Sequence, residues 1–416
     1  MKKNCATVIA IGDELLIGQV TDTNSGVVAR TLQPLGLEIN YVKVIHDNTD
    51  DIIRAVVDAL EKSDIVVTSG GLGPTRDDIT KAALMTIFGG ELVRIPFVEE
   101  TVRRIFQRRG LTVNQLSLDQ ALVPSSAIAI PNNYGTAPVM WFEKEGKVLV
   151  SLPGVPQEFQ GAWTDEVLPR LKKRLIPETH LAHRYATVSG ITESDLALLL
   201  ESWEISLNPS LHLAYLPNAP YIRLRLDGHH NDEEKLTKTI DLEFEKLLNL
   251  INPYLLFTGD ISPANALFEL LDQRQLTLSS AESCTGGRIA SAITGVPGAS
   301  RVFKGGVVAY DNSVKTDVLG VSQNNLNEYG AVSQQVVEQM ADGVSQVCRT
   351  GCSIATSGVA GPTGGTSQKP VGTVWIAVKT PKRIFSKKYF FLGNRERIVQ
   401  RASLQAIIDL LKELKC

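Results

Sequence analysis

Histidine is absent from the C-terminal part of this 416-residue chain, and cysteine is scarce throughout. The six histidines end at His230, so no Ser-His-Asp or Cys-His site can be built from the residues that follow. The five cysteines are widely scattered, which argues against a disulfide framework and indicates a reducing compartment. The expected location is therefore the cytoplasm.

A large net charge and a long apolar run are also missing. The formal net charge of −3 gives no basic footprint, which argues against a nucleic-acid partner. The first apolar run, 5–11, is too short for a signal-peptide core or a membrane span, so no membrane association is expected. Cys348 and Cys352 have no second pair or histidine after them, so a helical turn entering a strand explains them better than metal.

The length of the chain predicts two or three domains, because it exceeds what one hydrophobic core usually supports. Asn252-Pro253 and Ser262-Pro263 bracket an expected linker, since a residue before proline is disfavoured in a helix. The predicted domains are 1–175, 176–258 and 259–416.

The first domain alternates apolar strands with amphipathic helices. This pattern predicts an α/β fold with a parallel sheet covered on both faces and with ligands at the carboxyl ends of its strands. The expected strands are Ala6–Ile11, Ile39–Ile45, Ile65–Thr68 and Val148–Leu152. The expected helices are Thr23–Leu35, Asp50–Lys62, Asp77–Phe88, Leu92–Arg109 and Pro156–Arg174.

The rest of the chain predicts a small α+β module and then a second α/β domain. The module's expected strands are Tyr185–Val188, Leu211–Tyr215 and Tyr221–Leu226, with helices at Glu193–Trp203 and Asp232–Leu250. In the last domain the expected strands are Leu276–Ala281, Gly306–Tyr310, Cys352–Ser357, Gly372–Val378 and Lys387–Phe391. Its expected helices are Ala264–Asp272, Gly287–Ile293, Ser333–Cys348 and Arg395–Leu414.

Three glycines follow a buried strand of the first domain and lead to an acidic helix start. They are Gly70, Gly71 and Gly73, and the carboxylates are Asp77 and Asp78. Glycines let backbone N–H groups approach an anion, and two carboxylates suit an anion bridged by a divalent cation. N-capping by the two aspartates, with glycines serving only the turn, explains the same residues about equally well.

A second acidic pair, Asp13 and Glu14, follows the first expected strand. Because the carboxyl ends of parallel strands meet at one edge of a sheet, both acidic pairs are expected at the same edge. Two pairs at neighbouring strand ends favour a metal site.

These segments resemble the N-terminal domain of the CinA family, in 12–24, 70–78 and 152–159. The resemblance implies a molybdopterin-binding fold and a metal-dependent ADP-ribose pyrophosphatase that uses Mg, Mn or Co and yields AMP and ribose 5-phosphate. The implied metal ligands are Asp13, Glu14, Asp77 and Asp78, and the implied substrate contacts are Asn24, Gly70, Gly71, Gly73 and Thr75. One departure is Val139, where the family usually has glycine; a valine there could narrow the pocket. The middle module corresponds to the family's KH-like domain but lacks a Gly-x-x-Gly clamp, so a structural or dimer-forming role in a homodimer is expected.

In the last domain, Ser283 and Cys284 lie on a glycine-terminated turn between an expected strand and helix. Without histidine, a nucleophile here needs a lysine, tyrosine or carboxylate as its base, and Tyr310 and Lys315 follow a second glycine-containing segment. Lys315 can act as a base only if burial or a nearby positive charge lowers its pKa by several units, and Tyr310 could then relay the proton to it. Backbone N–H groups of the Cys284–Gly287 turn are the expected oxyanion donors.

The segments 281–320, 356–366 and 369–374 are similar to the C-terminal domain of the same family. The resemblance implies deamidation of nicotinamide mononucleotide (NMN), without a cofactor, by Ser283, Tyr310 and Lys315. The expected substrate contacts are Cys284, Thr285, Gly286, Gly287, Ser357, Gly358, Gly361, Gly364, Gly365 and Arg397.

Two alternatives stay open. Cys284 competes as the nucleophile, because a thiolate at a helix N-terminus is activated by the local field. A non-catalytic nucleotide- or pterin-binding regulatory protein linked to competence is the alternative to a bifunctional hydrolase of NMN and ADP-ribose.

Overall fold

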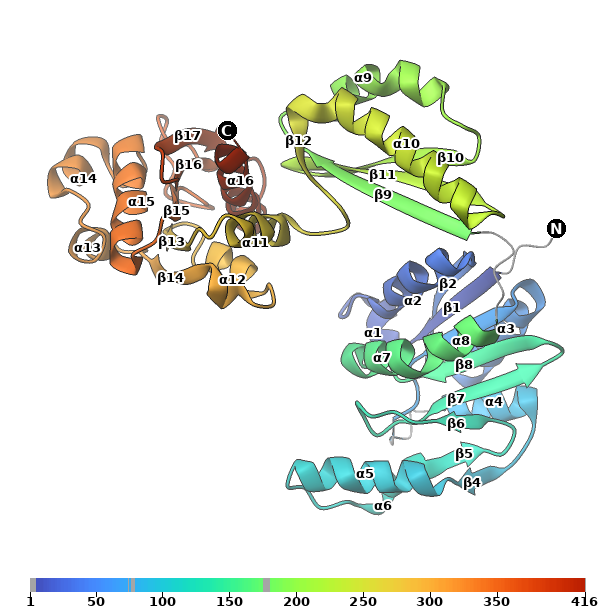
Figure 1. The fold of residues 1–416 in the computed structure, drawn as a ribbon. Coiled ribbons are helices and arrows are strands. Elements are labelled where there is room, and N and C mark those ends of the chain that lie inside the picture. The colour runs from blue at the N-terminus through green and yellow to red at the C-terminus, as the bar shows by residue number, and fades with distance from the viewer. Residues whose placement is uncertain (1–4, 74, 76–78, 175–179, 416) are drawn as a thin grey trace. The chain divides into compact units, whose positions relative to one another are not determined.

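The computed structural model describes residues 5–73, 75, 79–174 and 180–415, which form two compact units. Residues 1–182 with 229–237 belong to one unit, and residues 183–228 with 238–416 belong to the other. Figure 1 shows the helices and strands of each unit. The domain boundaries proposed from the sequence stay predictions. No helix in the described ranges combines the length and apolar character needed to cross a membrane.

The first unit is built on a six-stranded sheet in the order β2-β1-β3-β8-β7-β6. Four strands run parallel, as predicted: β1 (Cys5–Ile11), β2 (Glu38–Ile45), β3 (Ile65–Ser69) and β8 (Lys147–Leu152). Two antiparallel strands, which the sequence pattern did not predict, extend the sheet: β7 (Val139–Lys144) and β6 (Ile128–Ile130). The carboxyl ends of β1, β3 and β8 therefore meet at one edge, as expected.

Helices cover both faces of this sheet, which explains why its central strands are almost continuously apolar. One core contains residues of α2 and α7, and the other contains residues of α3 and α4. The helices are α1 (Asp13–Leu16), α2 (Asn24–Leu32), α3 (Thr49–Lys62), α4 (Thr80–Phe88), α5 (Pro96–Arg108), α6 (Gln115–Leu118), α7 (Pro156–Ala162) and α8 (Leu168–Arg174).

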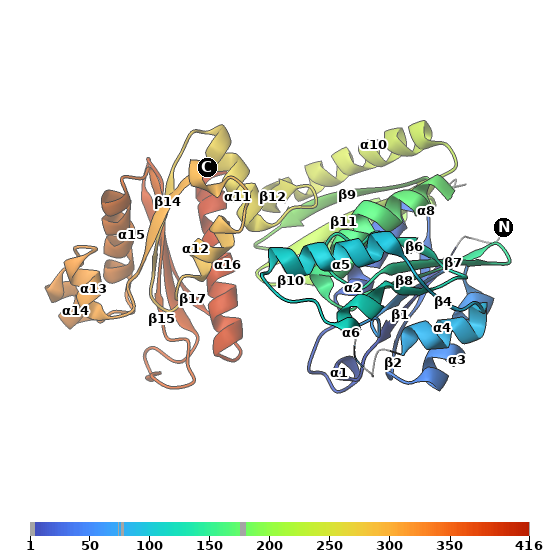
Figure 2. The same cartoon turned by 90° about the horizontal axis from the view of Figure 1, so that it is seen from below.

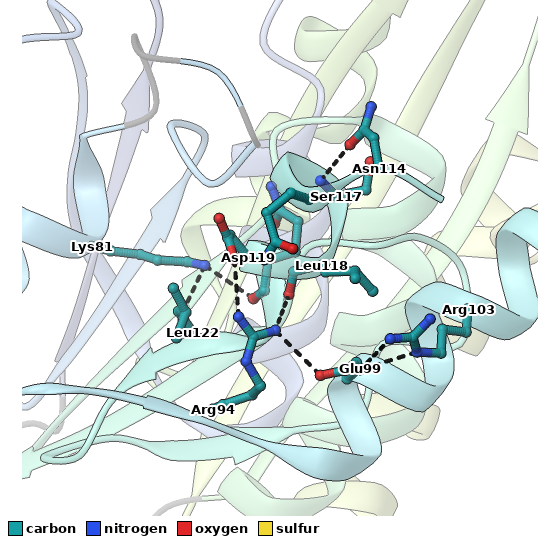
Figure 3. A network of polar contacts seen from close by, with 11 residues as sticks. Lys81, Arg94, Glu99, Arg103, Asn114, Ser117, Leu118, Asp119 and Leu122 are labelled. Carbon is teal, nitrogen blue, oxygen red and sulfur yellow. Dashed lines mark hydrogen bonds and ion pairs between the residues drawn. The ribbon is translucent and has the colours of Figure 1, made fainter. Parts of the chain in front are cut away.

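The predicted helix over 92–109 is wrong at its start. Residues Leu92–Arg94 form strand β4, which pairs with β5 (Leu122–Pro124), and α5 begins only at Pro96. Proline disfavours a helical conformation in the residue before it, which keeps this segment extended. Figure 3 shows the consequence: the Arg94 guanidinium donates to Asp119 (2.9 Å), to Glu99 (3.2 Å) and to a backbone carbonyl, so it ties β4 to α5.

The predicted α+β module is present as a four-stranded sheet in the order β10-β11-β9-β12. Its strands are β9 (His180–Val188), β10 (Leu211–Asn218), β11 (Tyr221–His230) and β12 (Leu255–Thr258). The helices are α9 (Glu193–Ile205) and α10 (Glu233–Ile251). Strand β12 was not predicted; it pairs antiparallel with β9.

The last sheet has the order β14-β13-β15-β16-β17, and Figure 2 shows α15 on one side of it and α12 with α16 on the other. Its strands are β13 (Leu278–Glu282), β14 (Phe303–Val308), β15 (Cys352–Gly358), β16 (Thr373–Lys379) and β17 (Ile384–Phe390). The helices are α11 (Pro263–Gln273), α12 (Arg288–Thr294), α13 (Asn312–Asp317), α14 (Gln323–Tyr329), α15 (Gln334–Cys348) and α16 (Arg395–Lys415). Helix α15 ends at Cys348 and β15 begins at Cys352, which confirms the helix-to-strand interpretation of that cysteine spacing.

Candidate active sites

The C-terminal candidate site lies at the carboxyl ends of three neighbouring parallel strands. Glu282, the last residue of β13, pairs with Val308 of β14 and with Thr356 of β15. Neighbouring strands are about 4.8 Å apart, so the residues that follow each strand end gather at one edge. The predicted site residues at this edge are Ser283, Tyr310 and Ser357.

The turn after β13 is fixed by two left-handed glycines and one buried carboxylate. Gly286 and Gly287 have φ values of 60° and 96°, a region that residues with a Cβ rarely adopt. The Glu282 side chain is 1% exposed and accepts hydrogen bonds from the backbone N–H groups of Gly287, Ile289 and Ala290, at 2.8–3.0 Å. The Glu282 carboxylate therefore accepts the hydrogen bonds of backbone N–H groups at the start of α12.

These bonds narrow the expected set of oxyanion donors. The Gly287 N–H donates to Glu282, and the Gly286 N–H donates to the Ser283 carbonyl at 3.2 Å, so neither is available. The backbone N–H groups of Cys284 and Thr285 donate to no acceptor in the described part of the chain. Only these two members of the predicted turn remain candidates for binding a developing negative charge.

Lys315, on α13, is a buried amine. Its side chain is 1% exposed, and Nζ donates to the carbonyls of Ala309 (2.7 Å), Tyr310 (3.2 Å) and Asp311 (3.5 Å). Burial lowers the pKa of Lys315 below its usual value, although Asp311 and Cys284 act in the opposite direction. A lysine base needs a shift in this direction, because its amine must lose a proton before it can accept one.

The structure weakens the case for Cys284 as the nucleophile. The residue is 7% exposed and packs in the hydrophobic core of the domain. Burial raises the pKa of the Cys284 thiol to about 12, and the Glu282 carboxylate adds to this shift. The thiol is therefore protonated at neutral pH, and the field of the helix N-terminus does not activate it.

Tyr310 is held by an arginine that the sequence analysis missed. The Tyr310 side chain is 59% exposed, and its hydroxyl accepts a hydrogen bond from Arg395 Nη2 at 2.8 Å. Arg395 Nη1 donates to the Gly361 carbonyl at 2.6 Å, so the same guanidinium also supports the glycine loop. The predicted Arg397 is exposed, and its guanidinium makes no hydrogen bond or ion pair with any residue that the structure describes.

Several predicted substrate contacts are already used within the fold. The hydroxyl of Ser357 donates to the Ala331 carbonyl (2.7 Å), and that of Thr285 pairs with the hydroxyl of Thr356 (2.7 Å). At the end of β15 and in the loop after it, a Cβ at any of three glycines would overlap neighbouring backbone or side-chain atoms: Gly358, Gly361 and Gly365. Gly364 is exposed, and a Cβ there would meet nothing closer than 3.9 Å, so it faces the open side of the loop.

In the N-terminal candidate site, two predicted glycines occupy positions that require glycine. Gly70 has a φ of 113°, and a Cβ there would overlap the Ile11 carbonyl at the end of β1. Gly71 has a φ of 64°, and a Cβ would overlap the hydroxyl of Thr80 at the start of α4. Thr75 is exposed nearby in sequence. The chain after β3 therefore passes closely between a strand end and a helix start.

Asn24 links two strand ends of this site. Its side chain is 6% exposed, and Nδ2 donates to Ser69 Oγ at the end of β3 and to the Gly154 carbonyl after β8, both at 2.9 Å. The amide thus holds the two loops together. Val139, where the chain departs from the family pattern, is fully buried in the core of this unit.

Only part of the predicted metal site can be described. Asp13 and Glu14 follow β1 directly, as predicted, and Asp13 Oδ1 lies 2.8 Å from Nδ1 of His46, which follows β2. Asp13 is 67% exposed, and such carboxylate oxygens are ligands of the kind that Mg²⁺ and Mn²⁺ take. Asp77 and Asp78 lie outside the described residues. Within the described residues alone, no group of three or more candidate ligands is assembled.

Comparisons with known proteins match the N-terminal and C-terminal parts of the chain to two different domain families. A model described as a probable molybdopterin binding domain matches residues 7–173, and a model of the CinA C-terminal domain matches residues 261–414. The chain is 41% identical to a CinA-like protein of Flavobacterium psychrophilum over 98% of each chain, and 40% identical to one of Cytophaga hutchinsonii over 99% of each. A putative competence-damage inducible protein of Caldanaerobacter subterraneus is 36% identical over 96% of each chain.

A molybdopterin-binding type of domain joined to a CinA-type α/β domain defines the class of this protein. The chain belongs to the CinA family.

Proposed function

We propose that the C-terminal site deamidates NMN to nicotinate mononucleotide and ammonia. The observation that carries this proposal is Lys315, a buried amine with a lowered pKa in a region of the chain without histidine. Lys315 follows β14, which pairs with β13, the strand that ends just before Ser283. Such an amine supplies the base that amide hydrolysis by a serine requires. No cofactor is needed for this chemistry.

In the proposed reaction, Ser283 Oγ forms a bond with the amide carbon while its proton passes, through Tyr310, to the Lys315 amine. The N–H groups of Cys284 and Thr285 bind the oxyanion. The C–N bond then breaks, and the proton held by Lys315 goes to the leaving nitrogen as ammonia departs. Water then attacks the ester carbon and the bond from this carbon to Ser283 Oγ breaks. One proton of the water restores the Ser283 hydroxyl, and the other passes to solvent as the carboxylate leaves.

The bonds around Lys315 are compatible with a neutral amine. A neutral amine has two N–H donors, which can keep the bonds to the Ala309 and Tyr310 carbonyls. Deprotonation then removes only the longest of the three hydrogen bonds, the one of 3.5 Å to the Asp311 carbonyl. Arg395 donates to the Tyr310 hydroxyl, whereas Lys315 donates to the backbone carbonyl of the same residue.

The N-terminal site, in the same proposal, hydrolyses ADP-ribose to AMP and ribose 5-phosphate with a divalent metal. Gly70 and Gly71 let the chain after β3 pass close to the end of β1 and the start of α4, and glycine-rich backbone at a strand end is typical of diphosphate-binding loops. Asp13 and Glu14, with Asp77 and Asp78, would hold the metal, which supplies charge neutralisation at the diphosphate oxygens. The protein would act as a cytoplasmic homodimer.

The test is to incubate the purified chain separately with NMN and with ADP-ribose, with and without Mg²⁺ or Mn²⁺, and to identify products by liquid chromatography. Nicotinate mononucleotide without metal, together with metal-dependent AMP, is the expected result. If folded protein forms neither product, the hydrolase proposal fails. A nucleotide- or pterin-binding regulatory protein, of the competence-related kind that relatives are named for, then takes its place.

A further inference from the structure

Helix α15 borders a hollow that the proposed reactions do not use. The hollow has a volume of about 460 Å³ and lies between α15, the chain after α13 and the start of β17. Figure 2 shows α13 and α14 beside α15, away from the central strands of this sheet. A volume of this size is typical of small-molecule sites.

The face of α15 that borders the hollow is polar but half buried. It carries amides and carboxylates at helical spacing, namely Gln335, Glu338, Gln339, Asp342 and Gln346. The opposite face of α15 packs in the core through Val336, Val337, Met340 and Val344. Four of the five polar residues are partly buried, and Gln346 is exposed.

The charge of the hollow is negative. Its lining contains two carboxylates, Glu338 and Asp342, and no lysine or arginine among the described residues. The Asp342 carboxylate accepts a hydrogen bond from Lys379 Nζ at 2.7 Å, so its charge is neutralised by a lysine that does not line the hollow. Glu338 accepts bonds from Ser386 (2.6 Å) and Gln334 (3.0 Å), but it has no cationic partner in the described chain.

Two amide side chains that line the hollow have no hydrogen-bond partner among the described residues. The side chains of Gln335 and Asn325 make no hydrogen bond with any described residue, although both are half buried. Their oxygens, together with the Glu338 carboxylate, form a set of acceptors that suits a ligand with several N–H donors.

The segment that lines the hollow is next to the residue that is hydrogen bonded to the backbone of Lys315. Leu319 and Gly320 line the hollow, and a Cβ on Gly343 of α15 would overlap the Leu319 carbonyl, so the two backbones touch. On the other side, the Val321 N–H donates to the Lys315 carbonyl at 2.9 Å. A ligand in the hollow therefore contacts the segment that ends the helix carrying the proposed base.

We propose that this hollow binds a small cation with several N–H donors, of the polyamine class, and that the bound cation stabilises the segment 317–321 behind Lys315. The carboxylate of Glu338 is the anchor for the cation, and Gln335 and Asn325 bind its other N–H groups. The bound cation would contact both α15 and the chain after α13, and would so stabilise their packing against each other. Binding does not depend on the proposed deamidation, so the two proposals can fail separately.

The test is calorimetric titration of the full chain with spermidine at physiological salt. Wild type is expected to bind, and Glu338→Gln, which keeps the shape and the Ser386 bond, is expected to weaken binding about tenfold or more. The matched control is Asp272→Asn, which removes an ion-paired surface carboxylate of the same domain outside the hollow. Equal binding by all three proteins, or no binding by folded wild type, would overturn the site.

Hydrogen exchange tests the second half of the proposal. Spermidine is expected to slow amide exchange in 317–321 in wild type and in Asp272→Asn, but not in Glu338→Gln at the same concentration. Binding without any change in that segment would overturn the stabilising role. Ribose and inorganic phosphate serve as neutral and anionic probes, and binding of either one as tightly as spermidine would overturn the assignment to a cation.

Discussion

The two candidate sites sit at the same kind of place, the carboxyl edge of parallel strands, but they differ in exposure. Lys315 in the C-terminal site is 1% exposed, whereas Asp13 in the N-terminal site is 67% exposed. Burial is one way to lower the pKa of a lysine, so that it loses its proton more easily, whereas carboxylates that bind a metal are charged and can be exposed to solvent before the metal binds. Two candidate sites at the same kind of sheet edge can therefore suit different chemistry, proton transfer where the ionisable group is buried and metal binding where it is exposed.

The largest expected effect is the loss of one proposed activity while the other is kept. Ser283→Ala is expected to reduce NMN deamidation by roughly 10³-fold or more, because the covalent step disappears. Metal-dependent ADP-ribose hydrolysis by the same protein should be unchanged, since Asp13 and Glu14 belong to the other unit. Product chromatography with both substrates measures the two rates.

The control for this variant is Cys284→Ala, which removes a neighbouring and deeply buried thiol. It is expected to retain deamidation, because the thiol pKa of about 12 keeps it protonated. Loss of activity in folded Cys284→Ala with activity kept in Ser283→Ala would reverse the assignment of the nucleophile.

The second effect concerns the pH dependence of deamidation. The Lys315 amine must be neutral to accept a proton, so the wild-type rate should rise with pH and level off above the Lys315 pKa, which lies below its usual 10.5. Lys315→Arg is expected to lose about 10²- to 10⁴-fold in kcat, because a guanidinium stays protonated. A Lys315→Arg protein with the wild-type pH profile would rule out Lys315 as the base.

A smaller effect is expected at the exposed site. Asp13→Asn should lower metal-dependent ADP-ribose hydrolysis by about 100-fold, because the variant has one charged ligand fewer, and should raise the metal concentration needed for half activity. His46→Ala, which removes only the neighbour of Asp13, should have a weaker effect. NMN deamidation serves as the internal control for folding. An Asp13→Asn protein with normal metal dependence would remove Asp13 from the site.

The smallest effect distinguishes two arginines two positions apart. Arg395→Ala is expected to reduce deamidation about tenfold or more, because it removes a charged hydrogen bond to Tyr310. Arg397→Ala removes an exposed guanidinium with no partner among the described residues, and its kcat should match the wild type. The opposite ranking in kcat would show that Arg397, not Arg395, serves the reaction.

Sequence patterns predicted the central strands well because those strands are buried on both faces. The run 65–68 has no polar face, and the structure extends it by one residue, to Ser69. The antiparallel strands β6 and β7 were missed, since their pairing depends on contacts between separate segments. The helix predicted from Leu92 failed because apolar periodicity could not reveal that β4 pairs with β5.

The site was predictable to the level of segments but not of individual contacts. Ser283 and Tyr310 follow β13 and β14, and Ser357 lies near the end of β15, whereas the pattern had placed Tyr310 inside a strand. The choice of Arg397 over Arg395 could not be made from sequence, because residues two positions apart point to different sides of a helix. Glu282 was missed for a similar reason: only the fold shows that its side chain turns back onto α12.

Glu282 also has a consequence for how the C-terminal site meets a substrate. Its three backbone bonds join the end of β13 to the start of α12 before any ligand is present. The turn bearing Ser283 is therefore preorganised, and its dipoles need no rearrangement when charge develops on the substrate. We expect residues 282–287 to superpose in free and substrate-bound crystals, so that reorganisation on binding falls to the exposed loop around Gly364.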